Sequence, residues 1–317
     1  MRRRKLGWTD LQLSAIGLGT WAMGGSNWQF GWGPQDDERS IATIHTALDL
    51  GINWIDTAPA YGLGHSEEVI GRAIRGMQEK PILATKCARV WGEERILHAS
   101  LKRESILREA EDSLRRLGVE RIDLYQIHWP EPEEDIEEAW LAMESLIQDG
   151  KIRYAGVSNF SVKQMQVIQA PHPIASLQPP YSLLKRGVED EILPYCGENQ
   201  IGVIPYSPLQ KGLLTGKVTP EWVAGLPEGD HRHGDPDFRQ PRLARNMRVA
   251  AGLAEIARES GHTAAQMAIA WLLRRPEVTA PIVGARKPSQ IEGTAPAGDW
   301  ELSQAEIAAV EKLLEEA

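Results

Sequence analysis

The 317-residue sequence is short of the features that mark secreted, metal-clustered or membrane-spanning proteins. Its only cysteines, Cys87 and Cys196, are too few for a disulfide framework or a cysteine-based metal cluster. No run approaches the roughly 18 uninterrupted apolar residues of a membrane-spanning helix. The basic start, residues 1–5, is not followed by the apolar stretch of a signal peptide. These absences predict a cytoplasmic protein in a reducing environment.

An excess of positive charge is also absent. The chain has 44 acidic side chains against 35 lysines and arginines, for a formal net charge of -9. Proteins that bind nucleic acid through its phosphates are typically basic, at least over one face. We therefore expect neither a nucleic-acid nor a membrane partner, and the sequence does not indicate an oligomeric state.

What the sequence does contain is an alternation of short apolar runs with helical patterns along nearly its whole length. The strand candidates are residues 16–20, 53–56, 81–86, 122–128, 153–158, 175–178, 202–206 and 280–283. Helical spacing occurs at residues 36–49, 67–74, 101–117, 136–147, 162–169, 188–199, 246–260, 264–273, 288–294 and 303–315. Eight strands, most of them followed by a helix, predict an α/β fold: a (β/α)8 (TIM) barrel formed by residues 1–317 as a single domain.

Three segments interrupt this rhythm. Residues 3–13 precede the first core strand and predict a β-hairpin across the bottom of the barrel, with its turn at residues 7–10. Residues 21–34 and 207–245 follow the first and seventh strands and are long and glycine-containing. Because barrel enzymes build their active sites on the loops after the strands, we expect both loops to contribute to a site. A mobile surface insertion is the alternative for the second loop.

Polar side chains end four of the predicted strands, at Asp56, Lys86, His128 and Ser158–Asn159. Asp56, Lys86 and His128 each follow an apolar run, and Tyr61 lies in the loop after Asp56. In a barrel these strand ends meet at one mouth, so an anion, a phenol, a cation and an imidazole can converge. Taken singly, Asp56 and Lys86 also fit a strand-end salt bridge, and His128 fits a hydrogen-bonded core histidine. Taken together they predict a catalytic site.

The sequence around these residues resembles the aldo-keto reductase family. Residues 51–67, GINWIDTAPAYGLGHSE, are similar to the family signature around its aspartate and tyrosine. Residues 81–86 resemble its lysine strand and residues 121–130 its histidine strand, and residues 152–160 and 178–182 match further segments in order. The resemblance covers nearly the whole chain. It implies an NADP(H)-dependent oxidoreductase that reduces small aldehydes or ketones to alcohols, or catalyses the reverse.

The resemblance makes Tyr61 the general acid for carbonyl reduction. A free phenol has a pKa near about 10, too high for an efficient proton donor at neutral pH. A cation about 4 Å away favours the phenolate by up to roughly 4 kcal/mol, or about three pKa units before desolvation is subtracted. We therefore expect Lys86, held by Asp56, to lower the pKa of Tyr61. A neutral His128 is expected to orient the carbonyl and stabilise its developing charge.

The resemblance also implies a nicotinamide site. Ser158, Asn159 and Gln178 match the positions that hold the carboxamide, and Tyr206 matches the aromatic residue that stacks on the ring. Three further residues, Gly19, Thr20 and Trp21, are expected to line the mouth of the barrel. Together with Asp56 they are expected to contact the cofactor.

The phosphate-binding residues are implied by two later segments. Those of the pyrophosphate loop are Ser207, Leu209 and Gly212, and those of the adenosine-phosphate segment are Gly284, Arg286 and Gln290. The arginine at position 286 suits a 2′-phosphate and predicts NADPH over NADH. The chain departs from many relatives at Gln290, where they carry arginine, and at Thr294, where they carry asparagine.

Two motifs suggest other chemistry. Residues 17–22 fit the dinucleotide-binding pattern G-x-G-x-x-A, but no helix begins directly after them, so we expect them to line the barrel mouth. His231 and His233 lie near two aspartates in a polar loop without a third ligand on a rigid element, and we expect no metal site there. The tryptophans Trp21, Trp28, Trp32 and Trp129 are candidates for the walls of a substrate pocket, with core packing as the alternative.

Two other functions remain open on the sequence alone. The first is a slow-turnover, NADP-binding regulatory protein on the same fold, like the relatives that are potassium-channel β-subunits. The second is a metal-dependent barrel hydrolase, against which the lack of a ligand cluster argues.

Overall fold

A computed structural model describes residues 1–26, 28–170 and 172–317. Its centre is a parallel sheet of eight strands in the order β11-β10-β9-β8-β5-β4-β3-β12. The strands are β3 (Gly17–Gly19), β4 (Trp54–Asp56), β5 (Ile82–Cys87), β8 (Ile122–Ile127), β9 (Ile152–Ser158), β10 (Ser176–Gln178), β11 (Gly202–Val203) and β12 (Ile282–Gly284). The two edges of this curled sheet meet, because Thr279 N donates to Val203 O at 2.7 Å and Ile282 N donates to Pro205 O at 2.8 Å. The predicted (β/α)8 barrel is confirmed.

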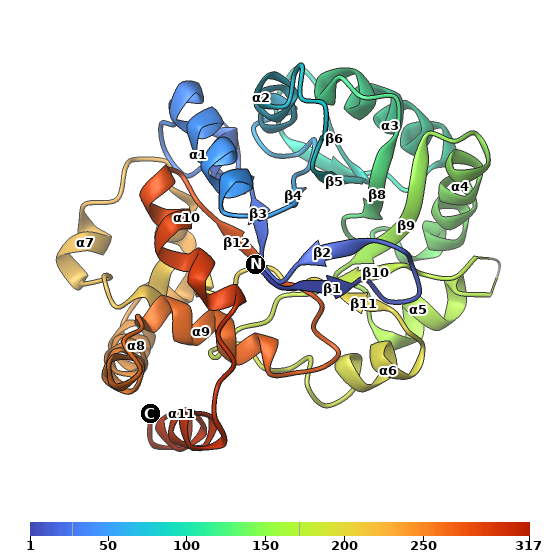
Figure 1. Ribbon diagram of the computed structural model, residues 1–317. Coiled ribbons are helices and arrows are strands. Elements are labelled where there is room, and N and C mark those ends of the chain that lie inside the picture. Colours follow the sequence, from blue (N-terminus) through green and yellow to red (C-terminus); the bar gives the residue numbers. More distant parts are fainter. Residues whose placement is uncertain (27, 171) are drawn as a thin grey trace.

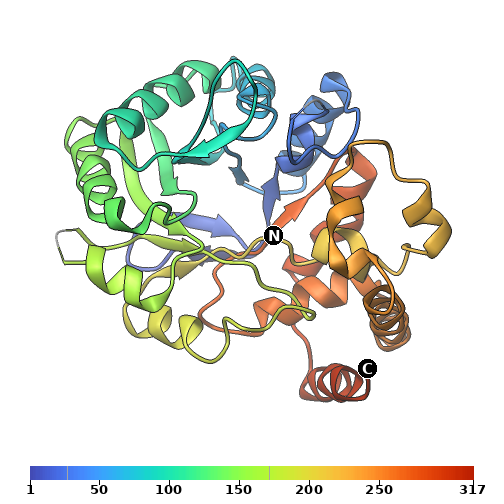
Figure 2. The ribbon, with the colours of Figure 1, turned by 180° about the vertical axis from the view of Figure 1, so that it is seen from behind.

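Helices surround the barrel in both views (Figures 1 and 2). They are α1 (Asp37–Asp49), α2 (His65–Ala73), α3 (Arg103–Leu117), α4 (Ile136–Gln148), α5 (Val162–Ile168), α6 (Ile192–Glu198), α7 (Pro220–Ala224), α8 (Arg242–Glu259), α9 (Ala264–Leu273), α10 (Pro288–Thr294) and α11 (Gln304–Glu316). Helix α3 shows why these segments are helical. Ile106, Ala110 and Leu117 recur at helical spacing and are buried, and Gly118 ends the helix at a φ of +66°. None of the helices in the described ranges combines the length and apolar character needed to cross a membrane.

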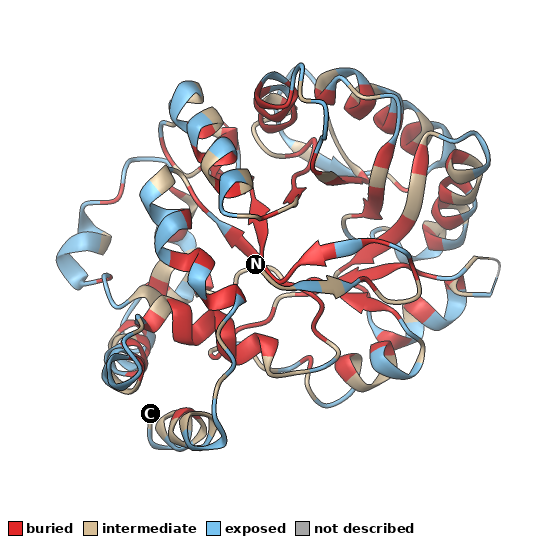
Figure 3. Ribbon diagram, in the orientation of Figure 1, coloured by how far each residue is buried: buried red, intermediate tan, exposed pale blue. Residues whose placement is uncertain are grey.

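The core fills the barrel and the layer between the strands and the helices. Figure 3 shows buried residues along the strands and on the sheet-facing sides of the helices. The barrel interior is packed near its lower end by Trp54, whose ring approaches Gly17 so closely that a Cβ there would lie 2.2 Å from it. The strands therefore hold their upper, carboxyl ends at fixed separations, and those ends carry the polar residues of the site.

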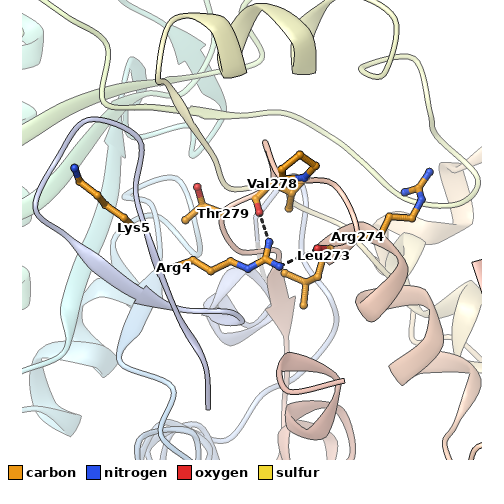
Figure 4. A pocket seen from close by; sticks show the side chains of 7 residues that line it. Arg4, Lys5, Leu273, Arg274, Val278 and Thr279 are labelled. Atoms are coloured by element: carbon orange, nitrogen blue, oxygen red, sulfur yellow. Dashed lines mark hydrogen bonds between the residues drawn. The ribbon is translucent and has the colours of Figure 1, made fainter. Parts of the chain in front are cut away.

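The N-terminal hairpin closes the lower end of the barrel, as predicted. Strands β1 (Arg3–Lys5) and β2 (Gln12–Ser14) pair in antiparallel fashion, and Figure 1 shows them crossing in front of the barrel. Arg4 fastens the hairpin to the α9–β12 connection by donating to Val278 O at 2.7 Å and Leu273 O at 2.9 Å, at the edge of a cavity of about 460 Å³ (Figure 4).

Several expected boundaries were wrong. The chain between β5 and α3 forms an unpredicted hairpin of β6 (Arg89–Trp91) and β7 (Leu97–Ala99), because neither strand has a clear apolar alternation. The segment 207–245 contains short 3₁₀ turns and helix α7 rather than only loop, and α8 begins at Arg242 instead of residue 246. Strand β11 ends at Val203 rather than residue 206 because Pro205 cannot donate a ladder hydrogen bond.

Candidate active site

An ion pair lies at the centre of the site. Asp56 is the last residue of β4 and Lys86 the penultimate residue of β5, and both are almost completely buried. Lys86 Nζ lies 2.9 Å from both carboxylate oxygens of Asp56 and donates to Thr57 O at 2.8 Å. Burial raises the pKa of Asp56 and lowers that of Lys86, and the charge of each partner opposes the shift of the other. The ammonium group is therefore held in one position by three oxygens.

Tyr61 lies against this pair. Its phenol oxygen accepts a hydrogen bond from Lys86 Nζ at 3.3 Å, and the ammonium is 5.1 Å from the ring centroid. The turn that carries it requires Gly62, with a φ of +67°, because a Cβ there would lie 2.3 Å from Gly24 O.

The expected lowering of the pKa of Tyr61 is not found. Burial raises that pKa well above the ordinary value of 10, and the negative charge of Asp56 raises it further. The physical reason is that Asp56 already compensates the charge of Lys86, so little positive field remains to offset desolvation at the phenol.

His128 follows β8 and forms the third side of the group. Its ring lies edge-to-face on the ring of Tyr61, with 6.0 Å between the centroids. Burial, followed by the charges of Lys86 and Arg89, lowers the pKa of His128 well below 6.5, which keeps the imidazole neutral near pH 7. Its Nδ1 atom is buried without a hydrogen-bond partner. A neutral imidazole can donate one hydrogen bond and accept another, which suits it to a polar ligand.

The predicted nicotinamide residues form one network with this group. Tyr206 Oη donates to Asn159 Oδ1 at 2.9 Å, and Asn159 Nδ2 donates to His128 O at 3.0 Å. Ser158 Oγ donates to Gln178 O at 2.8 Å, and Gln178 Nε2 donates to Asp56 Oδ1 at 2.8 Å. Asn159 has a φ of +62°, a conformation that asparagine tolerates better than most residues.

The end of the first strand also joins the site. Gly19 pairs with Asp56 across β3 and β4, and Thr20 Oγ1 donates to Asp56 O at 3.0 Å. The ring of Trp21 lies nearly parallel to that of Tyr61, with 6.3 Å between centroids. After β3 the chain makes a 3₁₀ turn at Trp21–Gly24, and α1 begins only at Asp37. Residues 17–22 thus lack the strand-to-helix turn of a dinucleotide-binding motif.

The predicted pyrophosphate loop has an unusual backbone. Ser207, Gln210, Lys211 and Gly212 all have positive φ, at +57°, +44°, +57° and +104°. Two of these N–H groups are used within the turn itself, since Gln210 N donates to Ser207 O at 2.9 Å and Gly212 N donates to Leu209 O at 3.0 Å. Leu209 lies within the same turn and is partly buried.

The adenosine-phosphate segment is ordered by side-chain contacts. Arg286 N donates to Gln290 Oε1 at 2.7 Å, and Arg286 Nε donates to Gln35 Oε1 at 2.9 Å. The guanidinium also contacts Pro34 O. Gly284 is exposed at the end of β12, whereas the hydroxyl of Thr294 donates to Gln290 O at 3.0 Å within its own helix.

The two long loops pack on each other. The backbone N and the Nδ1 of His231 lie 3.1 Å and 3.2 Å from Gly31 O. Arg232 lies between the rings of Trp32 and Trp222, at 4.5 Å and 4.9 Å from their centroids, and pairs with Asp230. His231 also contacts Trp21, with 4.7 Å between ring centroids. These histidine contacts are packing contacts, and no group of three or more metal-ligating side chains occurs among the described residues.

Sequence reasoning missed two buried polar residues next to the site. Gln126 pairs with Lys86 in the β5–β8 register and, to a small extent, opposes the rise in the pKa of Asp56 that burial causes. Glu67, on α2, accepts from Thr85 and Arg116. A glutamine near the end of a largely apolar strand was an available signal. The role of Glu67 could not be read from the sequence because its partners are distant in the chain.

Comparison with known proteins agrees with this geometry. A family model described as "Aldo/keto reductase family" matches residues 15–315. The chain is 43% identical to "Aldo-keto reductase YhdN" of Bacillus subtilis (strain 168) over 97% of this chain and 92% of the relative. It is 33% identical to the "NADH-specific methylglyoxal reductase" of Escherichia coli (strain K12), over 99% of both chains.

Solved structures show the same likeness. The glycerol dehydrogenase AKR11B4 from Gluconobacter oxydans superposes with a TM-score of 0.90 at 40% identity, covering 99% of this chain and 95% of that one. The aldo-keto reductase AKR11C1 from Bacillus halodurans superposes with a TM-score of 0.80 at 28% identity, over 99% and 96%. The fold and the comparisons define a TIM-barrel oxidoreductase that acts on carbonyl compounds. The chain belongs to the aldo-keto reductase family, whose members use nicotinamide cofactors.

Proposed function

We propose that this protein is an NADPH-dependent reductase of small aldehydes or ketones, also able to oxidise the corresponding alcohols, with Tyr61 as the general acid and base. The observation that carries the proposal is the 3.3 Å contact between Lys86 Nζ and the Tyr61 phenol oxygen, with the Asp56 carboxylate behind the ammonium. The neutral ring of His128 beside the phenol completes a site for one carbonyl oxygen.

Each of the four side chains has a distinct role in carbonyl reduction. His128 hydrogen-bonds the carbonyl oxygen and orients it toward Tyr61. Tyr61 stays protonated through the neutral range because its pKa is raised. It donates its proton only as negative charge develops on the carbonyl oxygen, since an alkoxide is a stronger base than a phenolate. Lys86 then stabilises the phenolate, and Asp56 prevents the ammonium from moving away.

The residues present fit a dinucleotide. When bound, the nicotinamide supplies the hydride, and the protein supplies its position. Ser158, Asn159, Gln178 and Tyr206 would hold the nicotinamide end. The turn at residues 207–212, which follows the seventh strand of the barrel, would lie beside the pyrophosphate.

The preference for NADPH rests on the charge around Arg286. The positive charges of Arg232 and Arg39 both act on this guanidinium, and the carboxylate of Asp230, which pairs with Arg232, opposes them in part. A 2′-phosphate would neutralise part of this charge, whereas NADH would not. Because the E. coli relative is named as an NADH-specific enzyme, a direct comparison of the two cofactors is necessary.

The test is a steady-state assay of NADPH oxidation with 4-nitrobenzaldehyde, methylglyoxal, glyceraldehyde and a panel of ketones and sugars, together with the reverse reaction on alcohols including glycerol. We expect turnover with at least one carbonyl and none above background in Tyr61→Phe. Tight NADPH binding without turnover above that of the Tyr61→Phe variant would instead favour a slow, regulatory NADP-binding protein.

A further inference from the structure

A second polar cluster lies on the outer side of the barrel wall, directly behind the catalytic ion pair. Its centre is the carboxylate of Glu67, which has no solvent exposure. Thr85 Oγ1 donates to Glu67 Oε1 at 2.6 Å, and Arg116 Nε donates to Glu67 Oε2 at 2.7 Å. Both carboxylate oxygens are thus engaged, one by β5 and the other by α3.

The cluster joins the two segments that carry Tyr61 and Lys86. Thr85 immediately precedes Lys86 on β5, and successive strand residues face opposite sides of the sheet. The hydrogen bond between Thr85 and Glu67, outside the barrel, therefore constrains the position of the backbone that carries the Lys86 side chain inside the barrel. Glu67 lies in the first turn of α2, and the preceding Ser66 N donates to Tyr61 O at 3.1 Å. Through this helix the same carboxylate holds the tyrosine turn.

Other contacts leave α2 little freedom to shift. Ser66 Oγ lies 2.8 Å from Thr20 Oγ1 and 3.1 Å from Thr57 Oγ1, which ties the helix start to the ends of β3 and β4. Gly71 allows α2 to approach α3 so closely that a Cβ there would lie 2.4 Å from Arg116 O. The hydrogen bond from Thr85 is the link that runs from this helix to the lysine strand.

A buried carboxylate is costly to the fold unless its charge is paired and hydrogen-bonded. The ion pair with Arg116 offsets this cost. Apolar side chains would be sufficient if the contact between α2 and β5 served only packing. Glu67 also acts on Lys86 electrostatically, since its negative charge favours the protonated amine. Geometry and charge therefore both connect this residue to the site.

We propose that Glu67 is a positioning residue that sets the separation of Tyr61 and Lys86 from outside the barrel, acting through Thr85 on one side and helix α2 on the other. This inference rests on the proposed function, because it concerns the proton transfer from Tyr61.

The first test removes the link without removing charge. Thr85→Val keeps the side-chain shape and deletes the hydrogen bond to Glu67. We expect kcat to fall about 10-fold, because small misplacements of reacting groups cost up to about 100-fold. The dissociation constant for NADPH, from fluorescence titration, should stay within about twofold of wild type. Thr85→Ser, which restores the hydroxyl, should recover most of the lost kcat.

The second test removes the charge. Glu67→Gln should lower kcat more than Thr85→Val does, and should move the alkaline limb of the pH profile for reduction to lower pH, because losing the negative charge disfavours the protonated form of Lys86. Thr85→Val, which keeps the charge, should leave the alkaline limb in place.

The matched control is Ser113→Ala, which deletes a 3.3 Å hydrogen bond to the same Arg116 but leaves the hydrogen bond between Thr85 and Glu67 intact. It should keep kcat within about twofold.

Crystal structures of the wild type and Thr85→Val supply a readout independent of turnover, the distance from Lys86 Nζ to the Tyr61 phenol oxygen. The proposal predicts that this distance lengthens or becomes heterogeneous in the variant. A folded Thr85→Val enzyme with wild-type kcat, or with an unchanged distance, would overturn it. Wild-type protein that turns over no carbonyl would overturn the proposed function instead, and the comparison of distances would then decide the positioning role by itself.

Discussion

The ammonium group of Lys86 contacts the phenol oxygen of Tyr61 at 3.3 Å while both oxygens of Asp56 hold it at 2.9 Å. This relationship places a hydrogen-bond donor at the atom that must carry negative charge after proton transfer. It does so in a buried position, where electrostatic interactions are stronger than in water. The ion pair therefore matters less for the resting acidity of the phenol than for stabilising its conjugate base.

Replacement of the phenol hydroxyl should abolish most turnover. We expect Tyr61→Phe to lower kcat for carbonyl reduction at least about 100-fold, the scale of a lost general acid. NADPH binding should persist, because the hydroxyl is not among the groups expected to hold the cofactor. Stopped-flow turnover and fluorescence titration of NADPH measure the two quantities. Intact turnover in this variant would remove Tyr61 from the mechanism.

The pH profile of reduction should be flat through the neutral range. The pKa of Tyr61 is raised, so the acid remains protonated, and the alkaline limb should come from loss of the Lys86 charge, because burial lowers the pKa of Lys86 from its ordinary 10.5. The pKa of His128 is lowered well below 6.5, so no limb from its protonation should appear between pH 6 and 8. The measurement is kcat/KM from pH 5 to 10.5 at saturating NADPH. A limb near pH 6.5 that disappears in His128→Gln would contradict the neutral-histidine assignment.

The cofactor preference should depend on Arg286. Arg286→Ala is expected to weaken NADPH binding about 10-fold or more and NADH binding by less than about threefold, because only NADPH carries the 2′-phosphate. Titration of the same protein samples with both cofactors measures the difference. Lys287→Ala, which removes the neighbouring exposed positive charge but keeps Arg286, is the matched control and should change the two affinities equally. Equal losses for the two cofactors in Arg286→Ala would refute the phosphate contact.

The contribution of Glu109 to the stability of the protein should fall as pH rises from about 4.5 to about 7. Burial raises the pKa of Glu109, on α3, from 4.5 to about 7, and its Oε2 has no hydrogen-bond partner. The native state thus binds this proton more tightly than the unfolded chain, and the associated stabilisation is complete below about pH 4.5 and lost by about pH 7. The upper limit of the effect is about 3 kcal/mol.

Glu109→Gln should remove this dependence. We expect the variant to unfold at a higher denaturant concentration than wild type at pH 8, and to differ little from it at pH 5. Urea titrations at the two pH values measure both free energies of unfolding. If the free energies of unfolding of wild type and variant differed by the same amount at both pH values, the carboxyl of Glu109 would not titrate in this range.

Much of the site could be predicted because barrel topology brings separate strand ends together. Asp56, Lys86 and His128 each end an apolar run. Their convergence could be predicted from these positions, because the carboxyl ends of the parallel strands meet at one mouth of the barrel. The raised pKa of Tyr61 could not be predicted, because it depends on how completely the packed loops exclude water and on how fully Asp56 compensates Lys86. The β6–β7 hairpin and the turns within residues 207–245 were missed because short polar segments take their conformation from what they pack against.

The sequence by itself determined the barrel, the order of its elements and the family to which it belongs, because these depend on hydrophobic periodicity and on the residues that end each strand. Only the tertiary structure decided which buried charges meet. Glu67, Thr85 and Arg116 are separated in the chain. They contact one another because α2 and α3 both pack beside the same part of β5. The guanidinium of Arg286 and the side chain of Gln35 likewise meet only because the first and last βα connections adjoin in a closed barrel.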